Sequence, residues 1–182
     1  CVAARLRREL PTATSLVLAF EAGGGPSRGT ALTSIEGLGK GGRVRVGGEL
    51  QKVPLAWKPR SFERDGEQRF AMTIPWGDVF TAYISTGIPD VEVYMAVPPA
   101  TAARLRRIRW LAPLLGLGPV QAWLKERVRR KGAGPSEEGR ARNGATIWGE
   151  VRDPSGREAR CRLRTPNGYE LTVTASLGIV QR

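Results

Sequence analysis

Residues 74–97 show the clearest pattern of hydrophobic and polar positions in the chain. Large apolar side chains recur there at the spacing i, i+3, i+4, i+7 and i+8 of one helix face, at Trp76, Val79, Phe80, Tyr83 and Ile84. Gly87 follows them, and glycine commonly ends a helix in the left-handed conformation. From Val91 onward apolar residues alternate with other residues, as in a strand. The pattern predicts a helix whose apolar stripe faces the core, followed directly by a strand.

The same analysis predicts the other elements. Helices are expected at residues 1–10, 30–38, 100–115 and 120–131, and strands at 15–20, 43–46, 49–57, 69–74, 148–152 and 159–163. Residues 131–144 are expected to form a loop, 169–173 a last strand or strand-to-helix junction, and 174–180 a weak helix. Gly47 and Gly48 supply the positive φ angles of a hairpin, and DPSG at 153–156 predicts a type I turn.

These elements together predict an α+β domain. We expect an open, mostly antiparallel or mixed sheet of about five to seven strands, with helices mainly on one face. The length of 182 residues suits a single core.

Composition narrows the possible chemistry. The chain has no histidine, the side chain most used as a general base near neutral pH and as a ligand of catalytic zinc. Ser-His-Asp catalysis and most zinc chemistry are therefore excluded, and no metal site is expected. Cys1 and Cys161 are too few for a disulfide framework and are interpreted as reduced thiols of a cytoplasmic protein.

Basic residues are concentrated in one segment. Residues 100–131 hold nine Lys and Arg side chains against Glu126 alone, a net charge of +8 out of +12 for the whole chain. The apolar centre of this segment, residues 108–124, is interrupted at Pro113 and Pro119. These prolines favour a broken helical hairpin over a straight membrane-spanning helix. So basic a segment implies a partner.

Three stretches of the sequence resemble one known family. They read GGPSRGTALTSIEGLGKGG at residues 24–42, IPWGDVFTAYISTGIPDVEVYMA at 74–96 and WGEVRDPSG at 148–156. In these three stretches the chain resembles the saccharopine dehydrogenase-like oxidoreductases, which include the trans-acting enoyl reductases of bacterial lipid synthesis. The stretches span most of the chain, in the order expected of the second domain of that family.

The resemblance implies that two domains have separate roles. In this family a Rossmann domain binds the nicotinamide cofactor, and the second domain supplies the substrate wall and the subunit contacts. Residues 1–12 would be the end of a preceding nucleotide-binding domain or a connecting helix, and 13–182 the substrate-binding and subunit-contact domain. The chain has no initiator methionine, which indicates a piece of a longer protein. NAD(P) is expected to bind through the nucleotide-binding domain, and this segment alone is not expected to catalyse a reaction.

The resemblance also implies a substrate site at the turn of residues 75–78 and on the helix that follows. Hydride transfer asks the protein mainly for orientation and exclusion of water, because the cofactor carries the chemistry. The residues alone allow plainer roles, with Asp78 capping the helix or lying in its first turn, and hydroxyl groups bonded to the backbone. No catalytic residue is assigned. The candidate substrate-binding residues are Trp76, Asp78, Thr81, Tyr83, Ser85 and Thr86.

A glycine-rich segment, residues 21–29, lies between a predicted strand and a predicted helix, as in dinucleotide sites. Its sequence departs from the GxGxxG motif. The sixth position is Arg28 in place of glycine, and Pro26 lacks a backbone N–H that could bind a phosphate. One interpretation is a hinge before a helix capped by Ser27 or Thr30. The other is an anion site formed by Ser27, Arg28 and Thr30 at the helix N-terminus.

The basic hairpin at 100–131 leaves several explanations open. It can lie on an anionic membrane surface, which would suit a lipid-like substrate, or form the contact of a homodimer, or be a solvated cationic face. Nucleic-acid binding is not expected, because no stacking array accompanies the basic residues. The candidate contact residues are Arg106, Arg107, Trp110, Leu114, Leu115 and Trp123.

The sequence therefore predicts the substrate-binding and dimerisation domain of an NAD(P)-dependent oxidoreductase, located in the cytoplasm or at a membrane surface and acting on a small-molecule or lipid-like substrate. The competing hypothesis is a basic membrane-peripheral or protein-interaction module without catalytic activity.

Overall fold

A computed structural model describes residues 1–23, 27–130 and 144–181 of the chain. The strands are β1 (Ser15–Ala22), β2 (Gly42–Val46), β3 (Glu49–Val53), β4 (Pro59–Arg64), β5 (Glu67–Thr73), β6 (Asp90–Ala96), β7 (Ala145–Arg152) and β8 (Glu158–Thr165). The helices are α1 (Val2–Glu9), α2 (Arg28–Leu38), α3 (Asp78–Thr86), α4 (Pro99–Ile108), the 3₁₀ turn η1 (Arg109–Leu111), α5 (Ala112–Leu115), α6 (Gly118–Arg130) and α8 (Gly168–Val180). The loop expected at 131–144 lies outside the described residues except for its last position.

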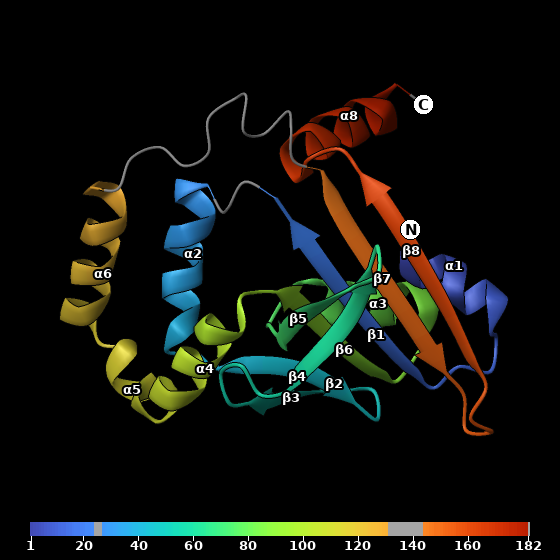
Figure 1. Ribbon diagram of the computed structural model, residues 1–182, viewed down its shortest axis with the longest axis horizontal. Helices are drawn as coiled ribbons and strands as arrows, with labels where there is room; N and C mark the ends of the chain where they lie inside the picture. The colour runs from blue at the N-terminus through green and yellow to red at the C-terminus, as the bar shows by residue number, and fades with distance from the viewer. Residues whose placement is uncertain (24–26, 131–143, 182) are drawn as a thin grey trace.

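Within these residues eight strands form one open mixed sheet, shown in Figure 1. The main order is β3-β2-β6-β1-β7-β8, while β5 also pairs with β6 and β4 with β5. The central strands β1 and β6 are parallel, and the other pairs are antiparallel. The prediction of an α+β fold with an open mixed sheet is confirmed, with more strands than expected.

Helices α1 and α3 cover one face of this sheet and bury the main core against it. Leu6 of α1, Ile88 and Val91 are fully buried there. At Gly149 of β7 an added Cβ would lie 2.4 Å from Cγ1 of Val2 and 2.6 Å from Cδ1 of Leu6. Glycine at this position therefore lets α1 lie directly on the strand.

Strand β4 was not predicted from the sequence. It pairs with β5 through a turn at Asp65 and Gly66, whose φ angles of 54° and 82° are both positive. An Asp-Gly pair between two strand-forming segments is a strong hairpin signal, and Asp65 and Gly66 provide it here. The hairpin predicted around Gly47 and Gly48 is present as β2 and β3, and β3 ends at Val53 before Pro54.

The end of the chain corrects one expectation. Residues 169–173, expected to form a last strand or a strand-to-helix junction, belong to helix α8. The side chain of Asn167 accepts a hydrogen bond from the backbone N–H of Glu170 at 3.0 Å, which caps the helix. β-Branched residues in this stretch favour a strand, but the cap starts a helix instead.

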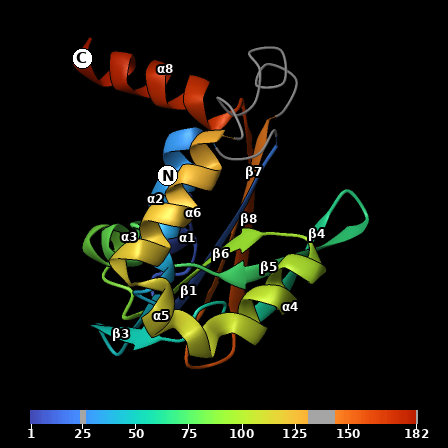
Figure 2. The ribbon, with the colours of Figure 1, turned by 90° about the vertical axis from the view of Figure 1, so that its left-hand side faces the viewer.

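Helices α2, α5 and α6 form a helical group beside the sheet (Figures 1 and 2). Gly39 and Gly116 let the backbones touch, since a Cβ on Gly39 would lie 2.5 Å from the Cα of Gly116. Gln121 donates to the carbonyl of Ile35 at 2.9 Å, and Lys125 Nζ lies 2.7 Å from a carboxylate oxygen of Glu36. The helix predicted at 100–115 is thus divided into α4, η1 and α5, and that at 120–131 is α6.

The DPSG turn between β7 and β8 is organised by the carboxylate of Asp153, which is 4 % exposed. This carboxylate accepts hydrogen bonds from Ser155, from Thr12 at 2.9 Å and from both the backbone and the side chain of Arg157. These donors, with Ser155 the strongest, lower the pKa of Asp153 well below its ordinary value of 3.8. The turn therefore ties the end of β7 to the residues that precede β1.

Because the folded-state pKa of Asp153 is depressed, its ionised form stabilises the fold at neutral pH. That contribution is complete above the unfolded value of 3.8 and is lost as the pH falls through the lower folded pKa. Asp153→Asn is expected to lower the melting temperature near neutral pH, with a difference from the wild type that shrinks in strong acid. Thermal unfolding monitored by circular dichroism from about pH 7 to pH 2 measures this. A difference that stays constant over this range would contradict the role of the carboxylate.

Candidate functional site

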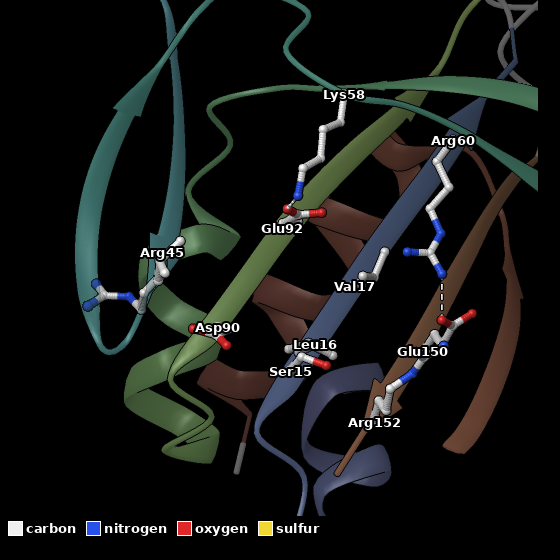
Figure 3. A pocket seen from close by; sticks show the side chains of 11 residues that line it. Ser15, Leu16, Val17, Arg45, Lys58, Arg60, Asp90, Glu92, Glu150 and Arg152 are labelled. Carbon is white, nitrogen blue, oxygen red and sulfur yellow. Dashed lines mark hydrogen bonds and ion pairs between the residues drawn. The ribbon is translucent and has the colours of Figure 1, made fainter. Parts of the chain in front are cut away.

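The face of the sheet opposite α1 and α3 carries a cavity of about 400 Å³, seen in Figure 3. Its floor comes from three neighbouring strands, and Lys58 and Arg60 reach over it from the start of β4. The lining residues on the floor are Ser15 and Val17 of β1, Asp90 and Glu92 of β6, and Glu150 and Arg152 of β7.

Four charged groups of this cavity form two ion pairs. Lys58 Nζ lies 2.5 Å from Oε1 of Glu92, and Arg60 Nη2 lies 2.5 Å from Oε1 of Glu150. The phenol of Tyr94 donates to the second oxygen of Glu92 at 2.6 Å. Burial, followed by this hydrogen bond, raises the pKa of Tyr94, so the phenol stays protonated. Since its acids and bases already have partners, the cavity offers a ligand little unpaired charge.

An aromatic cluster continues these contacts along β4. The ring of Phe62 lies 5.8 Å from that of Trp148 and 5.9 Å from that of Tyr94. The indole N–H of Trp148 donates to the carbonyl of Glu63 at 2.9 Å. We refer to Lys58, Arg60, Phe62 and their partners as the β4 clamp, because together they hold β4 against β6 and β7.

Arg45 of β2 lines the cavity, but its guanidinium points away from the cavity (Figure 3). The guanidinium is buried against α3, where Nε donates to the carbonyl of Val79 at 3.2 Å and Nη1 donates to the carbonyl of Gly48. It also lies 4.2 Å from the ring centre of Tyr83, a cation–π contact. Arg45 therefore fixes α3 to the β2–β3 hairpin.

Helix α3 presents a second candidate surface. Trp76, Phe80 and Ile84 are 45 %, 53 % and 68 % exposed, so the expectation that the predicted stripe faces the core is wrong for these three side chains. Of the predicted stripe only Val79 is fully buried, and it meets the sheet together with Ala82 and Thr86. These side chains are smaller and let the helix lie close to the strands.

The predicted substrate-binding residues all belong to α3 or the turn before it, and none of them lines the charged cavity. The hydroxyls of Ser85 and Thr86 both donate to the carbonyl of Ala82, at 3.2 and 2.6 Å, and Thr81 donates to that of Gly77. Asp78 lies in the first turn, and the N-cap residue is Gly77, which has no capping side chain. Tyr83 is half-buried under Arg45, and Trp76 contacts Phe20, with ring centres 5.3 Å apart.

The anion site suggested at residues 27–30 is the N-terminus of α2. Ser27 caps this helix, and its hydroxyl accepts the backbone N–H of Thr30 at 3.2 Å and contacts the Thr30 hydroxyl at 3.0 Å. Arg28 is the first helical residue and is exposed. The cap explains Ser27 without a ligand, and the anion site stays a prediction. Residues 24–26 of the glycine-rich segment lie outside the described residues.

Sequence reasoning did not single out Arg45, Arg60 or Glu150. The alternation in 91–97 placed Glu92 and Tyr94 on one face, which was the available signal for the clamp. Their partners lie on β4 or, for Lys58, directly before it, and this strand was not predicted. Within the described ranges no group of three His, Cys, Asp or Glu side chains is placed to hold a metal ion.

No protein-family model matches this sequence. No curated protein matches it either. Among solved structures, it is similar to apo histidine-tagged saccharopine dehydrogenase (L-Glu forming) from Saccharomyces cerevisiae, with a TM-score of 0.49 and 9 % sequence identity. The match covers 94 % of this chain and 59 % of that one, so the chain corresponds to little more than half of that structure. Similarity at this level does not carry the activity of that enzyme to this chain.

Proposed function

We propose that this chain is the substrate-side domain of an NAD(P)-dependent oxidoreductase, with α3 as one wall of the cleft shared with a nucleotide-binding domain. The observation that carries the proposal is the exposed stripe of Trp76, Phe80 and Ile84. Three large apolar side chains on one helix face are a surface that a partner covers. They lie in residues 74–96, the most specific of the stretches that resemble the oxidoreductase family.

The position of Trp76 supports this assignment. Its ring packs on Phe20, close to the carboxyl end of β1, and β1 and β6 are the parallel pair of the sheet. In open sheets with parallel strands, ligands bind beyond the carboxyl ends of those strands. A cleft there would place an apolar wall beside a nicotinamide ring and keep water away from a transferred hydride.

The charged cavity on the opposite face is a weaker candidate for the reaction site. Lys58, Arg60, Glu92 and Glu150 are paired with one another, so a charged substrate would have to displace existing ion pairs. In the proposed function these residues maintain the fold, and the α3 surface meets the cofactor and substrate.

NADPH binding by the full polypeptide encoded by the gene tests this proposal. Titrated with NADPH, it should quench or shift nicotinamide fluorescence, whereas residues 1–182 alone should not. Excitation of tryptophan should also sensitise emission from bound NADPH. Trp76→Phe is expected to reduce this energy transfer more than the matched change Trp110→Phe, because Trp76 lines the proposed cleft and Trp110 does not.

Two outcomes would count against the proposal. A full polypeptide that leaves nicotinamide fluorescence unchanged would remove the oxidoreductase assignment. Equal loss of energy transfer in Trp76→Phe and Trp110→Phe would keep the cofactor but remove α3 from the cleft.

A further inference from the structure

The segment α4–η1–α5–α6, residues 99–130, exposes large apolar side chains at its turn; we call it the basic arm. Trp110 and Trp123 are 75 % and 60 % exposed, and Leu114 and Leu117 are about half exposed. None of the residues of η1, α5 or α6 is buried. The arm thus presents two indole rings and two leucines in an otherwise basic region.

Three arginines before the apolar turn have no acidic partner among the residues that the structure describes. Within residues 1–23, 27–130 and 144–181, no ion pair or hydrogen bond engages the side chains of Arg106, Arg107 or Arg109. Arginines of the sheet differ, since Arg60 and Arg64 of β4 each contact a carboxylate. The unpaired positive charge therefore lies next to the exposed apolar side chains.

The arm is anchored at both ends, so its exposed groups are held in place. Ala102 of α4 is buried against the core, and α6 is joined to α2 through Gln121 and Lys125. The guanidinium of Arg127 lies 5.6 Å from the ring centre of Trp123, so a cation and an indole project together. The described helices include none that is long and apolar enough to cross a bilayer.

Charge selects among the partners that could cover this surface. The arm carries eight basic residues and one acidic residue, so two arms placed face to face would each bring a net charge of +7. A second copy of the chain would therefore meet strong repulsion. Nucleic acid would satisfy the arginines but leave Leu114 and Leu117 in water. An anionic phospholipid surface accommodates both, with indole and leucine side chains at the acyl boundary and arginines at the headgroups.

We propose that the basic arm binds the surface of membranes that contain anionic phospholipid, without crossing them. Trp110, Leu114, Leu117 and Trp123 enter the interface, and Arg106, Arg107 and Arg109 contact phosphate and carboxylate groups. This inference does not depend on the oxidoreductase function proposed above.

Flotation with two kinds of vesicle tests the proposal. The chain should float with vesicles of phosphatidylcholine mixed with phosphatidylserine and remain unbound with phosphatidylcholine alone. Tryptophan emission should shift to the blue on binding. The double change Arg106→Gln with Arg107→Gln should weaken partition roughly 25-fold, because each basic residue near an anionic surface contributes roughly five-fold. The matched change Arg8→Gln with Lys52→Gln, which removes the same charge elsewhere, should alter it less than about two-fold.

The apolar contribution has its own matched pair. Leu114→Ala should weaken partition roughly ten-fold, and Leu50→Ala, at a leucine of similar exposure on β3, should not. Equal flotation with both kinds of vesicle, or none with either, would overturn the proposal. So would equal losses in the arm and control variants. Concentration-dependent dimerisation in sedimentation velocity that Leu114→Ala abolishes would assign the arm to a subunit contact, and binding to duplex DNA that survives Leu114→Ala would assign it to nucleic acid.

Discussion

Replacing Phe62 by alanine is expected to lower the free energy of unfolding by about 3–5 kcal/mol, the usual cost of removing a buried aromatic side chain. Phe62 is 9 % exposed and lies between the rings of Trp148 and Tyr94. Its loss leaves a cavity under β4 and removes the apolar centre of the β4 clamp. Lys58 and Arg60 would then hold β4 through partly exposed ion pairs, each of which contributes little by itself.

Urea unfolding measures this change, and the near-ultraviolet circular dichroism of the native state should lose the signal of the stacked Phe62 and Trp148 rings. Phe80→Ala is the control, because Phe80 is 53 % exposed on α3 and should cost less than about 1 kcal/mol. Similar losses in the two variants would mean that the cluster does not anchor β4.

Replacing Leu6 by alanine is expected to destabilise the fold by about 2–5 kcal/mol. Leu6 is 0 % exposed and joins α1 to the sheet at Gly149, where the helix touches the strand. The Leu6 side chain fills the space over Gly149, which has no side chain of its own to occupy it when Leu6 is shortened. A cavity therefore remains, and its size sets where in this range the loss falls.

The matched control is Leu50→Ala, on the exposed face of β3. It should change the free energy of unfolding by less than about 0.5 kcal/mol. If Leu6→Ala also costs less than about 1 kcal/mol in urea unfolding, α1 is not part of the cooperative core. That result would favour the interpretation of residues 1–12 as a connecting helix.

The ends of α3 could be predicted from the sequence, but its orientation could not. Gly87 stops the helix at a φ of 68°, as its position after the apolar stripe indicated. Periodicity, however, shows that a stripe exists without showing which stripe meets the sheet. The smaller side chains of Val79, Ala82 and Thr86 recur at almost the same spacing and are the ones buried. The unexpected exposure of Trp76 and Phe80 is what makes this helix a candidate for function.

Long-range pairing was also beyond the sequence. Local alternation indicated β6 and β7, yet Arg60 and Glu150 meet across 90 positions. Such a contact depends on how the strands are arranged in the whole sheet, and the local sequence around either residue does not identify its partner. The basic arm differs, because its charge and its breaks are local properties. Its position was therefore predicted, although η1 and α5 divide it more finely than expected.

The central place of β1 in the sheet has a consequence for how the protein is made. Ser15 of β1 pairs with Asp90 on one side and with Arg152 on the other, so β1 must wait during synthesis for β6 and β7 before both its edges are hydrogen-bonded. Contacts of such sequence separation slow folding, and an apolar strand left open in the meantime is prone to aggregate. Synthesis of this chain in the cell should therefore depend on chaperones that shelter Ser15–Ala22 until translation passes residue 152.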